Sequence, residues 1–189
     1  MMYPIMAFGH GVLRKKALEV NSDYPDLSNL IGDMFETMIA AHGVGLAAPQ
    51  INLPIRLVVI DATPFEEEYP EAKNFKKVLI NPTILEESGE LWVFNEGCLS
   101  FPGLHEDVSR ASNVLVRYQD ENFQWHEEAH HGVVARVIQH ELDHLDGKMF
   151  IDRLNPLRKT LLKRRLDAIS KGDVQTEYRI LYPLKSKRK

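Results

Sequence analysis

One apolar helix near position 140 limits the possible folds most strongly. Residues 132–147 read GVVARVIQHELDHLDG, and their apolar side chains cover much of a helical wheel. A helix of this kind is buried on most sides, so we expect it at the centre of the fold. The same segment carries His140, Glu141 and His144, and buried polar groups of this kind need partners because unpaired burial costs free energy.

His140 and His144 stand four residues apart, which places them on one helix face within reach of a single ion. Neutral imidazole is a good ligand for zinc and for ferrous iron. Glu141 lies next to the first histidine and need not bind the ion, so it is free to transfer protons. The alternative is a solvated helix face that carries two histidines by chance. The burial expected for this helix favours the metal site.

Two histidines leave a catalytic metal site one protein ligand short. Metalloproteases of the HExxHxxGxxH type would have a third histidine at the position of Phe150. Other zinc proteases use a glutamate further downstream, and Glu177 is available for that role. The stronger candidate is Cys98 in NEGCLS (95–100), because a thiolate binds zinc or iron strongly. A lone cysteine is by default a small buried hydrophobic residue, so the ligand interpretation needs further support.

A third stretch, GVGLAAPQ at 43–50, suits a close approach of the backbone to a ligand or metal site. Gly43 and Gly45 permit the conformations that such an approach requires, and Gln50 offers an amide donor. The alternative is a helix end followed by a turn. On its own this stretch does not decide between the two.

The remaining patterns predict strands with helices at both ends of the chain. Residues 27–42 carry the apolar stripe of a helix, and a last amphipathic helix near 155–170 is basic on one side. Hydrophobic and β-branched runs indicate strands at 55–62, 78–85 and 89–97, and a hairpin over 112–132. The polar segment 63–77 contains two prolines and is interpreted as a surface loop. This order favours an α+β fold with mostly antiparallel sheets packed around the central helix.

Composition narrows the class of protein. The length of 189 residues suits a single domain over 1–189. A net charge of −4, from 23 basic and 27 acidic residues, gives no reason to expect DNA or a membrane as a partner. A single cysteine excludes an internal disulfide framework and fits a reducing compartment. Because the sequence shows neither an apolar run of membrane-spanning length nor a signal peptide, we expect a cytoplasmic enzyme or binding protein.

The three stretches GVGLAAPQ, EGCLS and QHELDH, in this order and at these separations, resemble peptide deformylase. Further similarity lies in VLRKKA (12–17), LINP (79–82) and GKMFIDRL (147–154). The resemblance implies a bacterial or organellar hydrolase of protein biosynthesis. Its substrates would be N-formylmethionyl peptides, from which it would remove the formyl group as formate.

The resemblance also implies a metal centre and its chemistry. Cys98, His140 and His144 would bind one divalent ion, which would be ferrous iron in cells, although zinc, nickel and cobalt suit the same ligands. An ion with three protein ligands can activate water. Glu141 would take the proton of that water and pass it to the departing amine.

The same resemblance implies groups that bind and polarise the substrate, namely Gly45, Gln50 and Leu99. The Gln50 amide and the backbone N–H of Leu99 are candidates to stabilise the negative charge that develops on the formyl oxygen. An apolar slot must take the methionine side chain. Its expected walls are Val44, Val137 and Ile138.

Other polar residues near the motifs have two interpretations. Glu96 and Asp143 either orient the metal ligands or form surface salt bridges, and the sequence leaves both open. His126, His130 and His131 flank the hairpin without the HExxH spacing, and we interpret them as solvated.

Two other functions compete with a deformylase. The first is a general zinc peptidase that uses His140, His144 and Glu177. The second is a structural metal module or ribosome-docking module, which would use the basic helix 158–165 and the tail KSKRK at 185–189. In some deformylases a C-terminal helix docks on the ribosome, so docking can accompany activity. In the segment FPGLHEDVSR (101–110), no arginine stands close to the cysteine motif, where some members carry one. The sequence therefore does not show how the protein binds the peptide beyond methionine.

Overall fold

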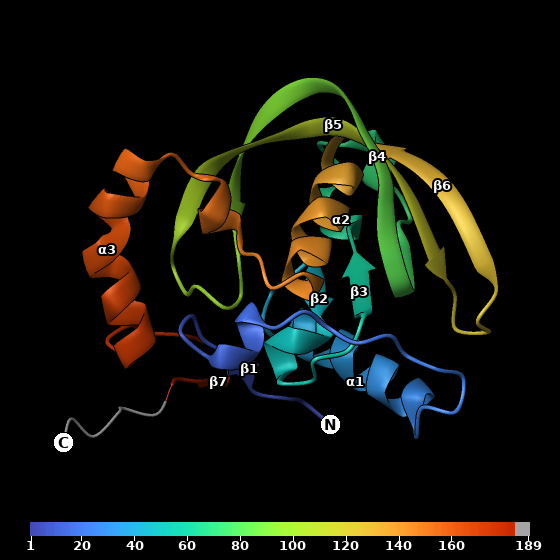
Figure 1. Ribbon diagram of the computed structural model, residues 1–189, viewed down its shortest axis with the longest axis horizontal. Helices are drawn as coiled ribbons and strands as arrows, with labels where there is room; N and C mark the ends of the chain where they lie inside the picture. Colours follow the sequence, from blue (N-terminus) through green and yellow to red (C-terminus); the bar gives the residue numbers. More distant parts are fainter. Residues whose placement is uncertain (184–189) are drawn as a thin grey trace.

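The computed structural model describes residues 1–183, in which a five-stranded antiparallel sheet arches over one buried helix (Figure 1). The helices are α1 (Leu27–Ala40), α2 (Gly132–Leu145) and α3 (Pro156–Lys171). The strands are β1 (Ile5–Met6), β2 (Gly45–Ala47), β3 (Leu57–Asp61), β4 (Lys76–Gly97), β5 (His105–Gln119), β6 (Trp125–His131) and β7 (Ile180–Leu181). The large sheet has the order β2-β3-β4-β5-β6, and β1 pairs with β7 in a separate parallel pair. The predicted α+β fold is confirmed.

Helix α2 occupies the centre, as its sequence predicts. Every residue from Val133 to Leu145 is buried. Its apolar side chains pack against Val58 and Ile60 of β3, while the alternate residues Leu57 and Val59 face the cluster that contains α1. Side chains of a strand alternate between its two faces, so β3 contributes to the core on both sides. Burying one such side chain fully contributes about 1.5–3 kcal/mol.

The segment 63–77 is more ordered than a polar surface loop. It forms short 3₁₀ helices at Thr63–Phe65 and Pro70–Ala72, and its aromatic side chains pack against the core around α2. Its Glu71 accepts a hydrogen bond from the backbone N–H of Val133 at 2.9 Å. A carboxylate at a helix N-terminus also opposes the helix dipole favourably. The segment thus fixes the start of the helix that carries the HExxH motif.

The strands expected at 78–85 and 89–97 are one strand. β4 runs for 22 residues and pairs with β5 from Ile80↔Gln119 to Gly97↔His105, with irregular register near Ser88. Gly89 adopts φ +79°, which lets the backbone pass the irregularity as a bulge instead of a turn. The prediction of two strands was therefore wrong, whereas both outer helices, the strand near 57 and the β5–β6 hairpin are confirmed.

None of the helices within residues 1–183 combines the length and the apolar character needed to cross a bilayer. The basic tail at 185–189 lies outside the described residues.

Candidate metal centre

The side chains of Cys98, His140 and His144 converge on one point, although Cys98 is more than 40 residues upstream of the others. One ligand atom from each lies within 4.8 Å of the other two. Cys98 Sγ is 3.4 Å from His144 Nε2. In a tetrahedral zinc site, sulfur at about 2.3 Å and nitrogen at about 2.0 Å from the ion are separated by about 3.5 Å. The three side chains therefore fit one divalent ion.

The two histidines differ in their second ring nitrogen. His140 Nδ1 lies 2.9 Å from Glu96 Oε2, which fixes the ring and leaves Nε2 for the ion. Burial acts to lower the pKa of His140, but hydrogen bonding to Cys98 and Glu96 raises it above its ordinary value. Burial lowers the pKa of His144 to about 3, so its ring stays neutral, as a metal ligand requires.

A buried network of charges supports the ligands from behind. Glu96 accepts hydrogen bonds from Arg110 Nε at 2.6 Å and from Arg136 Nη1 at 2.9 Å. Asp143 accepts from Arg110 Nη1 at 2.6 Å and from Arg153 Nε at 2.8 Å. Glu96, Arg110 and Asp143 are 4%, 1% and 7% exposed, so the surface salt-bridge interpretation was wrong. Burial would raise the pKa of both carboxyl groups, but the paired cations hold the pKa of each below its usual range.

Glu141 lies beside the three ligands without belonging to the cluster. Burial raises the pKa of Glu141 to about 7, and its Oε2 atom has no hydrogen-bond partner among the described residues. Across from it, a Cβ atom at Gly45 would lie 2.8 Å from Glu141 Cδ, so glycine leaves the space that the carboxyl group needs. This carboxyl group can gain or lose a proton near neutral pH.

Gln50 reaches the same point from the 3₁₀ helix Ala48–Ile51, which follows β2 directly. Its Oε1 accepts a hydrogen bond from the Ala47 N–H at 2.8 Å, which orients the amide. Its Nε2 points to Cys98 Sγ at 3.6 Å and to Ser100 Oγ at 3.4 Å. The amide donor is therefore held next to the thiol.

Leu99 follows the cysteine in a tight turn. The turn closes through the Phe101 N–H, which donates to the Cys98 carbonyl at 2.8 Å. The hydroxyl of Tyr178 donates to the Leu99 carbonyl at 2.7 Å. The backbone around Leu99 is thus fixed from the C-terminal part of the chain as well as by its own turn.

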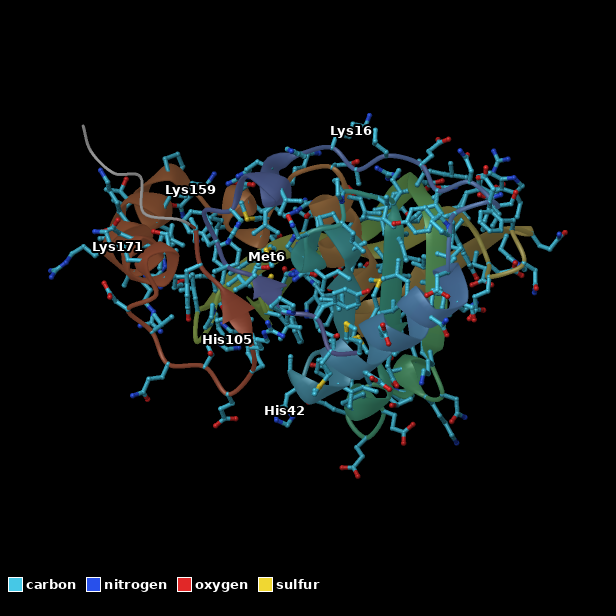
Figure 2. The ribbon with its side chains drawn as sticks, turned by 90° about the horizontal axis from the view of Figure 1, so that it is seen from below. Met6, Lys16, His42, His105, Lys159 and Lys171 are labelled. Carbon is cyan, nitrogen blue, oxygen red and sulfur yellow. The ribbon has the colours of Figure 1, made fainter. Side chains whose placement is uncertain are left out.

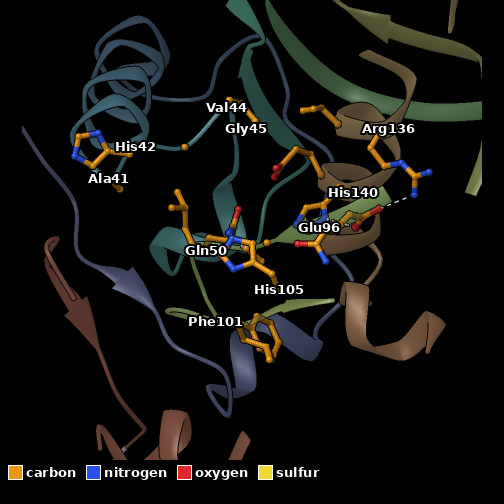
Figure 3. A pocket seen from close by; sticks show the side chains of 18 of the residues that line it. Ala41, His42, Val44, Gly45, Gln50, Glu96, Phe101, His105, Arg136 and His140 are labelled. Carbon is orange, nitrogen blue, oxygen red and sulfur yellow. Dashed lines mark hydrogen bonds and ion pairs between the residues drawn. The ribbon is translucent and has the colours of Figure 1, made fainter. Parts of the chain in front are cut away.

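Gln50, Cys98, Leu99, His140 and Glu141 line a cavity of about 480 Å³ between α1, α2 and the cysteine loop (Figure 3). Val44 and Val137 line it, as predicted for walls of an apolar slot. Ile138 does not line it and is fully buried in the core against the sheet. Ile138 points into the core between α2 and the sheet instead of toward the cavity, so the prediction that it forms a wall was wrong.

The other candidates lie elsewhere. Within residues 1–183, Cys98, His140 and His144 are the one set of potential ligands close enough to share an ion, so Glu177 has no place in it. His126 and His131 are at least partly open to solvent, whereas the side chain of His130 is 15% exposed and contacts Glu128 at 3.0 Å. The interpretation of His130 as solvated was therefore wrong.

Three supporting residues escaped the sequence analysis. Arg110 occupies an inward-facing position of β5, two residues after the buried Val108, and this alternation was the signal that could have revealed it. Arg136 stands among the valines of α2, and its signal was the apolar helical wheel that predicted burial on most sides of this helix. Tyr178 gave no such signal, because it approaches the site from a region without helix or strand periodicity.

Comparisons with known proteins agree with this geometry. A sequence model of the polypeptide deformylase family matches residues 2–160. The peptide deformylase of Christiangramia forsetii is 49% identical over 190 residues, which cover 97% of each chain. A crystal structure of a peptide deformylase from Legionella pneumophila superposes with a TM-score of 0.80 at 39% identity, covering 92% of this chain and 98% of that one. That of Thermotoga maritima gives a TM-score of 0.74 at 42% identity, covering 82% of this chain and 99% of the other.

Proposed function

The chain belongs to the polypeptide deformylase family, and from this premise we propose how its residues share the reaction. The protein is a metal-dependent hydrolase of protein biosynthesis that removes the formyl group from an N-terminal methionine. The general zinc peptidase with Glu177 as ligand is excluded by the position of that residue outside the metal cluster.

We propose that Cys98, His140 and His144 are the ligands of the ion. When bound, the ion supplies a Lewis acid that lowers the pKa of water and polarises the formyl group. One thiolate and two imidazoles accept ferrous iron, zinc, nickel or cobalt, and we propose ferrous iron as the ion in cells. Glu96 supports this assignment because it holds the His140 ring at Nδ1.

We propose Glu141 as the acid–base group. It takes a proton from the attacking water and later delivers one to the nitrogen of the departing amine, so formate and a free N-terminus result. A pKa of about 7 suits both steps. The absence of a side chain at Gly45 leaves free the place that this carboxyl group occupies.

Gln50 and Leu99 are proposed to stabilise the charge on the formyl oxygen. The Gln50 amide is oriented by Ala47, and the N–H of Leu99 belongs to the turn closed by Phe101. Removing one donor of this kind typically costs about 3 kcal/mol, or a hundredfold or more in rate. The methionine side chain is proposed to enter the apolar part of the cavity beside Val44, Gly45 and Val137.

The convergence of one thiol and two imidazoles beside a free carboxyl group is the observation that carries this function. It is tested by purifying the protein without oxygen, measuring its metal, and following formate release from a formyl-methionyl peptide. Glu141→Gln should keep metal and fold but lose about a hundredfold to ten-thousandfold in rate, since general acid–base catalysis contributes about 10²–10⁴-fold. The exposed Glu127 offers a matched control, and Glu127→Gln should act as wild type. An unchanged rate in Glu141→Gln would refute its role.

We propose that the protein works in the cytoplasm. A thiolate ligand is oxidisable, and a reducing compartment preserves it. Cys98 is the single cysteine of the chain, so it has no partner for an internal disulfide.

A ribosome contact through α3 is a further proposal. Leu157 and Leu161 of α3 are 72% and 65% exposed, and Lys163 and Arg164 on the same helix are exposed as well. A basic surface is attracted to RNA phosphates, and that attraction weakens as salt rises. Co-sedimentation with ribosomes at low salt should be lost in the double variant Lys163→Glu/Arg164→Glu while formate release is kept. Equal co-sedimentation of both proteins would overturn the proposal.

A further inference from the structure

The loop of residues 98–100 is held at each of its three carbonyl groups. The first carbonyl accepts a hydrogen bond from the N–H of Phe101 at 2.8 Å, and the third accepts one from the N–H of Phe8 at 2.8 Å. The second, that of Leu99, accepts from the hydroxyl of Tyr178 at 2.7 Å. Two of these donors are backbone groups, so Tyr178 is the one donor that a substitution can remove without changing the backbone.

The first two of these bonds lie on either side of the Leu99 Cα atom. In a planar trans peptide unit the N–H and the C=O point in opposite directions, so the bond from Phe101 directs the N–H of Leu99 away from the turn. The bond from Tyr178 holds the next peptide unit. Rigid peptide units rotate only about φ and ψ, so holding the units on both sides of this Cα atom fixes the direction of the Leu99 N–H.

Apolar packing alone would hold Leu99 less precisely. Its side chain approaches the end of α1 so closely that a Cβ atom at Gly43 would lie 2.7 Å from Leu99 Cδ1. The same side chain packs against the cluster that contains Met38. Hydrophobic contact has no preferred direction, whereas a hydrogen bond depends on the angle between its groups. The Tyr178 hydroxyl therefore supplies a directional restraint that packing does not.

The segment that carries Tyr178 is itself fixed. The Thr176 hydroxyl donates to the Tyr178 carbonyl at 3.0 Å. Shortly after it, Leu181 of β7 pairs with Met6 of β1 (Figure 2). Burial raises the pKa of Tyr178 above its ordinary value, so the hydroxyl stays protonated and can donate. The family match ends at residue 160, so this donor comes from a part of the chain beyond the matched residues.

We propose that Tyr178 is a positioning residue for the deformylation reaction. It acts through Leu99, whose backbone N–H is proposed above to stabilise the charge on the formyl oxygen. The inference therefore rests on the proposed function and deepens it. A donor of this kind is most effective when it is oriented before the charge develops, and the Tyr178 hydroxyl provides that orientation.

Tyr178→Phe tests the role of the hydroxyl, because it removes this group and keeps the ring. With formyl-Met-Ala as substrate, kcat should fall by about three- to tenfold, as expected for the loss of one hydrogen bond. KM should stay near that of wild type, because the bond serves the transition state and not the binding of the substrate. Metal content should also stay unchanged.

Tyr182→Phe is the matched control. It removes one hydroxyl from the same segment, but Tyr182 does not line the metal cavity, whereas Tyr178 does. This variant should keep the kcat of wild type. Amide hydrogen exchange of the metal-loaded proteins gives a second measurement. Exchange in the loop of residues 98–100 should become faster in Tyr178→Phe and stay unchanged in Tyr182→Phe, because exchange reports local opening.

The outcomes separate this inference from the function on which it rests. Wild type without activity on formyl-Met-Ala would overturn the proposed function and the inference with it. If wild type is active and Tyr178→Phe keeps its kcat, or if both tyrosine variants lose equally, the inference alone is overturned. A loss confined to KM would also overturn it, because the hydroxyl would then serve substrate binding.

Thr176→Val decides if Tyr178→Phe does not fold. This variant removes the hydrogen bond to the Tyr178 carbonyl and keeps the shape of the side chain. It should lower kcat by about twofold at unchanged KM and speed exchange in the loop of residues 98–100. Unchanged kcat and unchanged exchange in Thr176→Val would overturn the inference.

Discussion

Helices α2 and α3 are similar in length, yet they place their charged side chains in opposite surroundings. On α2, Arg136 and Asp143 are buried and belong to a network with Glu96 and Arg110. On α3, Lys171 pairs with an aspartate one turn earlier while about half of each side chain stays exposed. Charges removed from water must be paired, because an isolated buried charge is very costly. Exposed charges face no such demand.

The comparison shows where ion pairs determine the positions of neighbouring residues and where they do not. Around α2, the ion pairs restrict Glu96, which contacts His140, and Asp143, which precedes His144. The network therefore acts as a rigid support for the site. On α3, the pairs restrict little, and the basic side chains remain free to meet a partner. The same residue types therefore fix the geometry of the metal site on α2 and remain free to contact a partner on α3.

Removing Glu96 should give the largest effect. Glu96→Leu leaves Arg136 buried without a carboxylate and Arg110 paired with Asp143 alone, and breaking a buried pair costs about 3–5 kcal/mol. Urea unfolding should show this loss in the free energy of unfolding.

The matched control on the α3 side is Glu106, whose side chain is 6% exposed but whose partner Arg158 is 49% exposed. Glu106→Leu lets that arginine return to water, so the loss should stay near 1 kcal/mol. Equal losses in the two variants would contradict the contrast between the helices.

Adding one methyl group at Gly45 tests whether the position of the Glu141 carboxyl group matters for the rate of formate release. A Cβ atom there would lie 2.8 Å from Glu141 Cδ, so Gly45→Ala must displace the carboxyl group. A misplacement of about 1 Å can cost about a hundredfold in rate. Formate release should fall by that factor with the metal content unchanged.

Gly32 in α1 supplies the control, because a Cβ atom there would meet nothing within 4 Å. Gly32→Ala should keep full activity and gain up to about 1 kcal/mol of stability from its better helix propensity. If Gly45→Ala is as active as Gly32→Ala, the carboxyl group does not need the space opposite Gly45.

The hydrogen bond from Val133 to Glu71 should have a smaller effect. Glu71→Ala removes the acceptor at the start of α2, and the net value of one hydrogen bond is about 1 kcal/mol. Thermal unfolding should show a modest drop in Tm, whereas Glu67→Ala in the same segment, where the side chain is exposed, should leave it unchanged. A Tm that responds equally to both would show that Glu71 does not hold the helix.

The exposed pair on α3 should give the smallest effect. Lys171→Ala removes an i,i+4 contact to Asp167, worth about 0.3–0.5 kcal/mol and screened by salt. Urea unfolding at low and high salt should differ little between variant and wild type. A loss above about 1 kcal/mol would mean that this surface pair contributes as a buried one does.

The sequence predicted those parts of the site whose residues are close together in the chain. His140 and His144 share a helix face because of their spacing, and the apolar wheel around them located the helix at the centre. Cys98 was the preferred third ligand because a thiolate binds zinc or iron strongly, and the motif resemblance supported it. Nothing in its neighbourhood shows which distant residues it will meet.

The rest depended on tertiary contacts. Arg110 reaches Glu96 and Asp143 across the sheet and the helix, and only the paired register of β4 and β5 brings them together. Tyr178 reaches Leu99 across 79 positions of the chain. Ile138 failed as a pocket wall because its direction depends on how α2 is rotated against the sheet.

The most direct measurement of the central claim is the metal content of Cys98→Ala beside that of wild type, both purified without oxygen and loaded with ferrous iron or zinc. Wild type should hold one ion per chain. The variant, left with two histidines, should lose most of its metal and its formate release while its unfolding by urea remains cooperative. One tightly held ion per chain in Cys98→Ala would contradict the proposal that the thiol and the two imidazoles form a single coordination sphere.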